Sequence, residues 1–217
     1  MLIRQINQLK HCANIDEIIV ATTGNPSDEP IVNLMRENRV RWFCGSEHDV
    51  LKRYVDAASD VDADVIIRVT ADCPLIDPSI ADRVIAALVS NASDCDYASN
   101  VLQRTYPRGL DVEVMFMDTL LRIDRMAYSQ AAREHVTIVP RSERPDMFML
   151  KSVVDATDNS DLRWTVDTEA DLLLVRKIYE HFNMADRQVL YPEILSYVRS
   201  KPELGQINEG VETWSPD

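Results

Sequence analysis

The sequence predicts an α/β fold, in which helices cover the faces of a mostly parallel sheet. Short β-branched runs that end in polar residues alternate with helical stretches along the chain, and this alternation is typical of α/β domains. The clearest strand signal is the run 64–70, Asp-Val-Ile-Ile-Arg-Val-Thr. A helix follows it, with Asp77 at the cap and Pro78 at the first helical position. We expect one domain over residues 1–208 and a polar tail over 209–217.

The other elements follow from hydrophobic periodicity and capping residues. Strands are predicted where short apolar runs occur, at 17–22, 40–44, 95–99, 111–116, 147–153 and 162–166. Helices are predicted at 1–12, from 28, from 46, at 78–90, in two pieces over 118–140, from 168 and at 192–200. We expect Ser46 to cap its helix. Asp167 or Thr168 is expected to cap another, with Asp171 completing a capping box. The tail after Pro202 is expected to be loose.

Composition and charge exclude several classes of protein. The chain has 23 basic and 36 acidic residues, a net charge of −13, and no basic block, which disfavours nucleic acid as a partner. A polyphosphate ligand would need a divalent cation to bridge it to such an acidic protein. No apolar stretch approaches the ~18–20 residues of a membrane span. Because the four cysteines match no C-x-x-C pattern, we expect a reducing, cytoplasmic location.

Two aspartates follow predicted strands directly. Asp72 comes after the run 64–70, and Asp167 comes after the run 162–166. Ligands of open α/β sheets bind outside the carboxyl ends of the strands, and Mg²⁺ is typically held by one or two carboxylates plus substrate phosphates. The pair therefore predicts a metal site, with Arg68 and Arg163 as candidates for nearby positive charge. The structural alternatives are a turn at Asp72 and a helix cap at Asp167.

Two further segments carry polar residues where a ligand could bind. The loop that begins at Gly45 leads into a helix N-terminus, a natural place for a polar ligand group; the alternative is a plain capped helix with a solvated Arg53. Asp111 and Glu113 alternate with apolar residues, so both carboxylates face one side of a strand. They form either a polar wall that recognises substrate hydroxyls or a solvated strand face.

Six sequence blocks occur together over almost the whole chain, from residue 1 to about 208. They are Ala21-Thr22, Gly45-Ser46-x-x-Asp49-Val50-Leu51-x-Arg53-Tyr54, Arg68-Val69-Thr70-Ala71-Asp72-Cys73-Pro74-Leu75-Ile76-Asp77, Tyr106-Pro107-x-Gly109-Leu110-Asp111-Val112-Glu113, Arg133-Glu134-His135-Val136-Thr137 and Arg163-Trp164-Thr165-Val166-Asp167-Thr168. In this order they resemble the cytidylyltransferase-like family of spore-coat polysaccharide biosynthesis proteins. That family is related to the CMP-acylneuraminate and CMP-KDO synthetases.

The resemblance implies a glycosyltransferase-A-like sheet and an activity. A nucleotidyl group would pass from CTP to a sugar or sugar acid, with release of pyrophosphate, in a homodimer. Such a transfer needs a metal and fixed positive groups on the phosphates more than covalent help from the protein. Asp72 and Asp167 match the family's Mg²⁺-binding carboxylates. The residues in blocks that flank the nucleotide are Thr22, Gly45, Ser46, Asp49 and Arg53, and those where the sugar is held are Tyr106, Gly109, Asp111 and Glu113.

The chain departs from that family at its start. Family members begin with a strand and a loop of the type Gln-Ala-Arg-x-x-Ser-x-Arg-Leu-Pro-Gly-Lys, whose Arg and Lys hold the triphosphate. The run Met1-Leu2-Ile3-Arg4-Gln5-Ile6 aligns with the helix that follows, so we expect that strand and loop to be missing.

Three explanations compete for this departure: a sequence that begins at an internal Met, a non-catalytic binding or assembly homologue, and a site completed by another chain. We favour the first, because losing a central strand would leave unpaired backbone groups that cost about 1–3 kcal/mol each. A glycosyltransferase that uses a nucleotide-sugar donor is a further alternative. Against it, Asp94-Cys95-Asp96 precedes a predicted strand and does not follow one.

Overall fold

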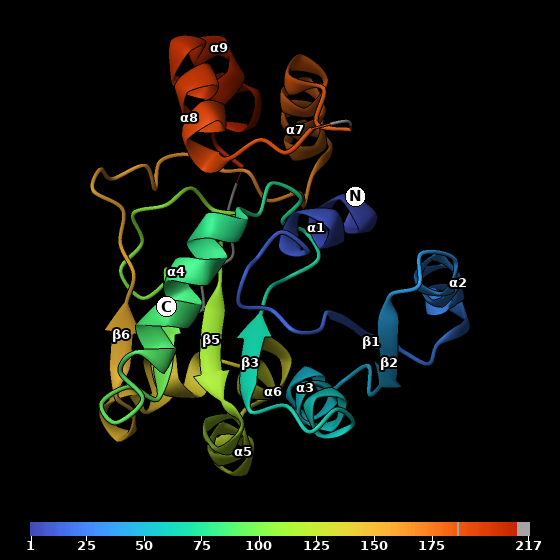
Figure 1. Ribbon diagram of the computed structural model, residues 1–217, viewed down its shortest axis with the longest axis vertical. Helices are drawn as coiled ribbons and strands as arrows, with labels where there is room; N and C mark the ends of the chain where they lie inside the picture. Colours follow the sequence, from blue (N-terminus) through green and yellow to red (C-terminus); the bar gives the residue numbers. More distant parts are fainter. Residues whose placement is uncertain (186, 212–217) are drawn as a thin grey trace.

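The computed structural model describes residues 1–185 and 187–211, which form two sheets flanked by helices (Figure 1). β1 (Ile19–Thr23) and β2 (Arg41–Gly45) are a parallel pair. The second sheet has the order β3-β5-β4-β6, and its strands in that order are Val65–Arg68, Glu113–Phe116, Tyr97–Ser99 and Leu150–Ser152. β5 is antiparallel to β3 and β4, whereas β4 is parallel to β6. All strands of this sheet except β5 thus run in one direction, and the predicted α/β class is confirmed.

Helices cover both faces of the four-stranded sheet because its strands bury apolar residues on both sides. On one face, Val114 of β5 belongs to a buried cluster with Ile85 and Leu88 of α4 (Pro78–Val89). On the other, Met115 belongs to a cluster with Ile123 of α5. The helices of this second face are α3 (Val50–Ser59), α5 (Met117–Met126) and α6 (Gln130–His135). The alternation of β5 side chains therefore places one helical layer on each face.

The C-terminal helices form a separate layer, seen at the top of Figure 1. It comprises α7 (Glu169–Phe182), α8 (Tyr191–Ser200) and α9 (Pro202–Gly205). Trp164 is fully buried among their apolar residues. The prediction of a loose tail after residue 202 is wrong for its first part, because α9 and a 3₁₀ turn at Gln206–Asn208 bury Leu204 and Asn208. The last part, 212–217, lies outside the described residues.

The predicted strand at 162–166 is reduced to a single bridge. Arg163 pairs with Arg108 in parallel register. The main-chain N–H of Arg108 donates to Leu162 O (3.0 Å), and that of Trp164 donates to Arg108 O (2.6 Å). The segment is thus extended and bonded to its neighbour, but too short to count as a strand.

The N-terminal part packs beside β3 without forming a ladder with it. α1 (Leu2–Leu9) buries Ile6 against α2 (Glu29–Glu37) and the β1–β2 pair. Among the described residues β1 pairs only with β2, and β3 only with β5. Two main-chain carbonyl groups just beyond β3 accept hydrogen bonds from side chains. The Tyr54 hydroxyl donates to Val69 O (3.4 Å) and the Gln5 amide donates to Thr70 O (2.6 Å).

Short helical turns complete the described structure, at Pro26–Asp28, Val139–Glu143 and Pro145–Met147. None of the helices in the described part of the chain combines the length and the apolar character that crossing a membrane requires.

Candidate active site

The end of β3 lies directly beside the segment 162–166. The main-chain N–H of Val166 donates to the carbonyl oxygen of Asp72 (2.9 Å), and the Thr165 hydroxyl donates to the Asp72 carboxylate (2.5 Å). Asp167 is the next residue along the chain. The structure therefore brings the two predicted metal-binding aspartates to the same edge of the fold, although 94 positions separate neighbouring Asp72 and Val166 in sequence.

Asp167 does not cap the helix that follows it. Thr168 is the N-cap of α7, and Asp171 completes a capping box with it, which settles the two alternatives for the cap. The Asp167 side chain is 57% exposed, and Arg163 donates to it (2.5 Å). Because the capping box uses other residues, the Asp167 carboxylate is available for a ligand.

Arg163 is fixed beside Asp167 by a second, buried carboxylate. Its Nε donates to Asp171 (2.9 Å), whose side chain is fully buried and also accepts from the amide of Asn208 (2.7 Å). Burial alone would raise the pKa of Asp171, but the hydrogen bonds from Arg163, Asn208 and Thr168 hold that pKa well below its usual range. Arg163 is thus where the sequence predicted positive charge, and Asp171 keeps it there.

Arg68 and Glu113 lie elsewhere, as a buried pair between β3 and β5. The two residues are directly opposite in the ladder and form an ion pair. Glu113 also accepts from the hydroxyls of Tyr97 (2.5 Å) and Thr137 (2.6 Å). Burial alone would raise the pKa of Glu113, but the positive charges of Arg68 and Arg141 and the hydrogen bonds from Thr137 and Tyr97 together outweigh it, and the pKa lies below its usual value. Neither residue reaches a ligand surface, so the expectation of Arg68 beside the metal and of Glu113 on a polar wall is not met.

The other three residues expected on the sugar side have different roles. Asp111 receives two hydrogen bonds from Arg104, at 2.7 and 2.8 Å, and stays partly exposed. Tyr106 is buried, and its hydroxyl accepts from Arg83 (2.6 Å). Gly109 has φ +101°, and a Cβ there would lie 2.5 Å from the main-chain nitrogen of Thr165. Of these three residues Asp111 alone is partly exposed, whereas Tyr106 and Gly109 are buried.

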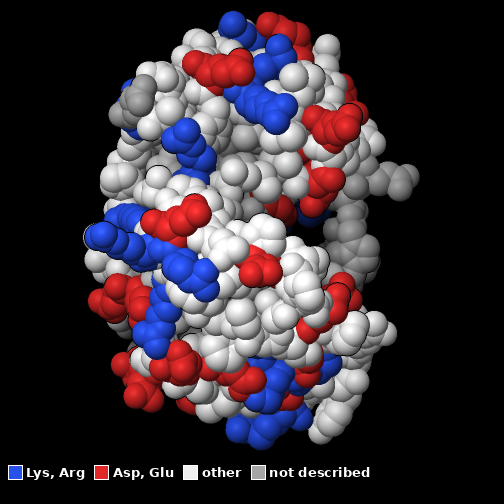
Figure 2. Space-filling view, turned by 90° about the vertical axis from the view of Figure 1, so that its right-hand side faces the viewer, with Lys and Arg blue, Asp and Glu red and all other residues white. Residues whose placement is uncertain are grey.

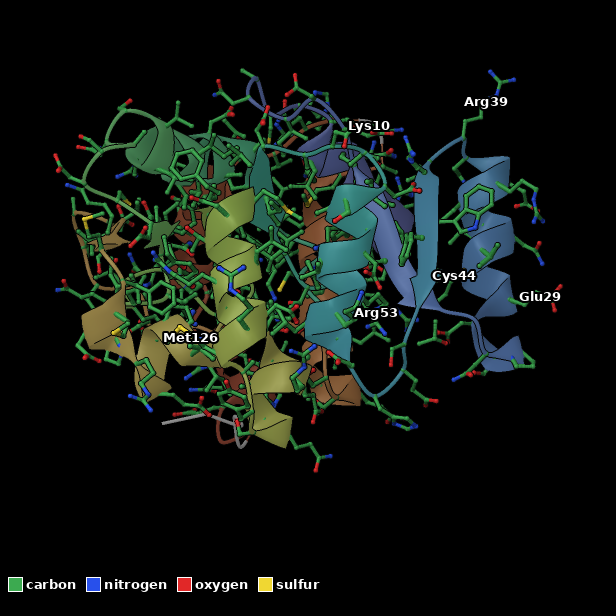
Figure 3. The ribbon with its side chains drawn as sticks, turned by 90° about the horizontal axis from the view of Figure 1, so that it is seen from below. Lys10, Glu29, Arg39, Cys44, Arg53 and Met126 are labelled. Carbon is green, nitrogen blue, oxygen red and sulfur yellow. The ribbon has the colours of Figure 1, made fainter. Side chains whose placement is uncertain are left out.

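The residues expected around the nucleotide come together at the ends of β1 and β2. Thr22 pairs with Cys44 in the ladder, one residue before Gly45. The guanidinium of Arg53 donates to Ser46 O (2.5 Å), and a Cβ on Gly45 would lie 2.8 Å from Arg53 Cγ. Figure 3 shows Arg53 on the side of α3 that faces β1 and β2. Gly45 is therefore required for the close packing of Arg53 along the loop.

The cap of α3 is Asp49, which corrects the prediction of Ser46. The Asp49 carboxylate accepts from Lys52 N (2.8 Å), whereas the Ser46 hydroxyl accepts from Asp49 N (3.1 Å). Asp49 also accepts two hydrogen bonds from Arg133, at 2.9 and 2.6 Å. Because its oxygens serve the cap and Arg133, Asp49 positions the loop and does not offer an unpaired carboxylate to a nucleotide.

Sequence reasoning missed three residues that organise the site. They are Thr165, which holds Asp72, Arg133, which holds Asp49, and Asp28, which accepts from the hydroxyl groups of Thr22 (2.9 Å) and Thr23 (2.6 Å). Thr165 and Arg133 belong to two of the six blocks, so the blocks were a signal. A threonine within a β-branched run, however, is indistinguishable from an ordinary strand residue.

The donor set at the strand ends fits Mg²⁺. Asp72 and Asp167 offer carboxylate oxygens, which are the ligands that this hard cation prefers. Within residues 1–185 and 187–211 there is no group of three or more His, Cys, Asp or Glu side chains placed to enclose a metal. Two carboxylates suit a cation that takes its remaining ligands from water and substrate phosphates.

Comparison with known proteins agrees with this geometry. A family model described as cytidylyltransferase matches residues 1–185. The chain belongs to the cytidylyltransferase family. The resemblance inferred from the six blocks is thereby confirmed, and this cytidylyltransferase-family protein has relatives in both archaea and bacteria.

Two sequence relatives and one solved structure illustrate the family. An uncharacterized protein of Methanocaldococcus jannaschii is 31% identical over 208 residues, 95% of this chain and 82% of the relative. The spore coat polysaccharide biosynthesis protein SpsF of Bacillus subtilis is 30% identical over 169 residues, 76% of this chain and 68% of the relative. A cytidylyltransferase from Leptospira borgpetersenii has a TM-score of 0.89 at 27% identity, covering 99% of this chain and 87% of that one.

Proposed function

We propose that this protein transfers a cytidylyl group from CTP to a sugar or sugar acid, with release of pyrophosphate, in the synthesis of a surface polysaccharide. The observation that carries the proposal is the hydrogen bond from Val166 N to Asp72 O, because it places Asp72 and Asp167 at one edge of the fold. Membership of the cytidylyltransferase family supports the reaction. The name of the Bacillus subtilis relative supports the pathway.

In this proposal Asp72 and Asp167 would hold Mg²⁺, whose positive charge would offset the negative charge of the phosphates. Thr165 fixes the orientation of the Asp72 carboxylate through its hydroxyl. Arg163 lies beside Asp167 and keeps positive charge at the same place. Asp111, oriented by two hydrogen bonds from Arg104, is the group that would orient a sugar hydroxyl. Little covalent help is needed, because holding the reactants in place supplies much of the acceleration.

Two further proposals accompany this one. We infer a homodimer, as the resemblance to the cytidylyltransferase-like family implies, and a cytoplasmic location, since CTP is an intracellular substrate and the free thiols of Cys12, Cys73 and Cys95 are buried in the fold. Analytical ultracentrifugation of the purified chain tests the dimer, and a sedimenting species of 24.7 kDa would contradict it.

Two measurements on the purified chain test the function. The first is a thermal shift with CTP and Mg²⁺, with EDTA added in a parallel sample. The second is pyrophosphate release from CTP in the presence of a panel of sugar acids. Asp72→Asn and Asp167→Asn should lower the rate about 10²–10³-fold, the scale on which loss of one preorganised electrostatic group acts. Asp146→Asn is the matched control, because Asp146 is exposed and lies on a short turn away from both strand ends.

Different failures would point to different functions. The thermal shift is therefore also run on a version extended upstream through any in-frame codons; if neither form is stabilised by CTP and Mg²⁺, the protein would be a binding or assembly homologue. Release of a nucleoside phosphate from a nucleotide-sugar, without pyrophosphate from CTP, would indicate a glycosyltransferase. Equal rates for Asp72→Asn and wild type would remove these aspartates from the mechanism.

A further inference from the structure

A cavity of about 570 Å³ lies between the segment 160–164 and the C-terminal helices α8 and α9. Three arginines line it, Arg108, Arg163 and Arg199, together with two acidic residues, Asp161 and Glu209. This is an unusual concentration of positive charge for a chain whose net charge is −13. On the face shown in Figure 2, basic and acidic side chains are intermixed around uncharged areas.

Two of the three arginines are already neutralised. Arg163 is paired with Asp167 and with the buried Asp171. Arg199 is paired with Asp161 across 2.6 Å, on the rim of the cavity. Arg108 differs, because none of the ion pairs formed within residues 1–185 and 187–211 includes it.

The main chain holds Arg108 firmly where it is. Its N–H donates to Leu162 O, and its carbonyl accepts from Trp164 N. The next residue, Gly109, has φ +101° and packs closely against the main chain of Thr165. The nearby carboxylate, Asp111, is occupied by Arg104. The carboxylates of Asp111 and Asp161 are thus already paired with other arginines, and Glu209, the other acidic residue of the lining, forms no ion pair with Arg108 in the described part of the chain.

Other positively charged side chains surround Arg108. Burial lowers the pKa of Arg108, and the neighbouring guanidinium groups of Arg104, Arg163 and Arg141 lower it further, against a smaller opposing influence of Asp111. A half-buried cation among other cations is unfavourable unless an anion joins it. Arginine suits that role, because its planar guanidinium bonds carboxylate and phosphate groups through two parallel N–H donors.

A second donor belongs to the same cavity lining. Trp164 lines the cavity, and its indole Nε1 is buried with no hydrogen-bond acceptor among residues 1–185 and 187–211. Buried donors without an acceptor are rare in native structures, and each calls for an explanation. A ligand oxygen in the cavity, after a small side-chain adjustment, would supply that acceptor.

We propose that this cavity binds an oxyanion, the carboxylate or phosphate group of a small ligand, through the guanidinium of Arg108. The site shares Arg163 with the Asp72 and Asp167 edge, but the Arg108 guanidinium is not one of the residues proposed to hold the metal, and binding there requires neither CTP nor Mg²⁺. Its existence therefore does not depend on the transfer reaction proposed above.

The experiment is a calorimetric titration of the CTP-free, Mg²⁺-free protein at constant ionic strength. The probes are inorganic phosphate, glucose 6-phosphate and glucuronate, with glucose as the neutral control. Tryptophan fluorescence in the same titrations is recorded on a Trp42→Phe and Trp214→Phe double variant, in which Trp164 is the remaining tryptophan. The variants are Arg108→Gln and Arg108→Lys. The matched control is Arg125→Gln, which removes the same charge from an exposed position on α5.

Arg108→Gln should weaken binding of the anionic probe about 10- to 100-fold, as expected for losing a charge-assisted bidentate contact. Arg108→Lys should bind with intermediate affinity, and Arg125→Gln should bind like wild type. Binding of glucuronate alone would identify a sugar acid as the ligand class, and binding of the phosphates alone a phosphate-bearing ligand. The proposal is overturned if no anion binds the wild type. It is equally overturned if Arg108→Gln binds as tightly as wild type, or if binding is lost in Asp72→Asn instead.

Discussion

The hydroxyl of Thr165 donates to the carboxylate of Asp72 across 2.5 Å, although the two residues lie 93 positions apart in the chain. Together with the bond from Val166 N to Asp72 O, this contact joins the end of β3 to the segment that leads into α7. One carboxylate oxygen of Asp72 is therefore already hydrogen-bonded to Thr165, and the orientation of the Asp72 side chain depends on that bond.

Replacing that hydroxyl should weaken the site more than the fold. Thr165→Val keeps the shape of the buried side chain but removes the donor to Asp72. We expect unfolding free energy in urea to fall by about 1 kcal/mol, the usual net worth of one hydrogen bond. The stabilisation by CTP and Mg²⁺ in a thermal shift should fall as well. Thr165→Ser restores the donor and should recover the nucleotide response; if it does not, the hydroxyl is not what orients Asp72.

Gly109 should tolerate no side chain. Its φ of +101° disfavours L-residues, and a Cβ would lie 2.5 Å from Thr165 N. We expect Gly109→Ala to lower the unfolding free energy by at least about 1–3 kcal/mol, through backbone strain and displacement of the neighbouring segment. Gly24→Ala is the control, because nothing lies within 4 Å of its Cβ position. Similar melting temperatures for the two variants would show that the segment 163–165 can move freely.

Removing the Glu113 carboxylate should lower the stability of the fold, because the positive charge of Arg68 is then left without its partner. In Glu113→Gln the amide can still accept from Tyr97 and Thr137, but Arg68 loses its buried counter-charge. Losing one partner of a buried pair costs about 3–5 kcal/mol, and urea unfolding at neutral pH measures it.

The double variant Arg68→Met with Glu113→Gln removes the orphaned charge as well. It should therefore be more stable than Glu113→Gln alone. A double variant as unstable as the sum of the two single variants would contradict this account, because the two residues would then act independently.

Asp171 should make the free energy of unfolding depend on pH in the acidic range. Its pKa in the folded state lies well below the unfolded value, because Arg163, Asn208 and Thr168 donate to the charged form and outweigh the effect of burial. The stabilisation is therefore fully present above the unfolded pKa of about 3.9 and is lost as the pH falls through the folded pKa. Asp171→Asn should be less stable than wild type at pH 7 in urea unfolding.

The difference between the two proteins should shrink as the pH is lowered below about 4. A constant difference from pH 7 to pH 3 would mean that the ionisation of Asp171 contributes nothing. Asp146→Asn serves as a control, since Asp146 is an exposed carboxylate on the short turn Pro145–Met147.

Much of the fold was predictable because it depends on local patterns. The run 64–70 contains β3, and the Asp77-Pro78 pair begins α4 as expected, with Asp77 accepting from Ser79 N and Ile80 N. The capping box at Thr168 and Asp171 was readable in the same way. Capping and hydrophobic periodicity act within one or two turns of chain, so the sequence contains everything needed to recognise them. It also determined the family, through six blocks in a fixed order.

Only the tertiary structure decided what the polar side chains do. The alternation around β5 placed Asp111 and Glu113 on one face, yet Arg104 holds the first near the surface and Arg68 buries the second. Thr165 looked like an ordinary strand residue and proved to orient Asp72. Arg108 lines a cavity and forms no ion pair with a carboxylate in the described part of the chain. These roles depend on partners 7 to 93 positions away in the chain. Sequence periodicity indicates which face of an element a side chain occupies. Its ion-pair and hydrogen-bond partners on that face are determined only by the folded chain.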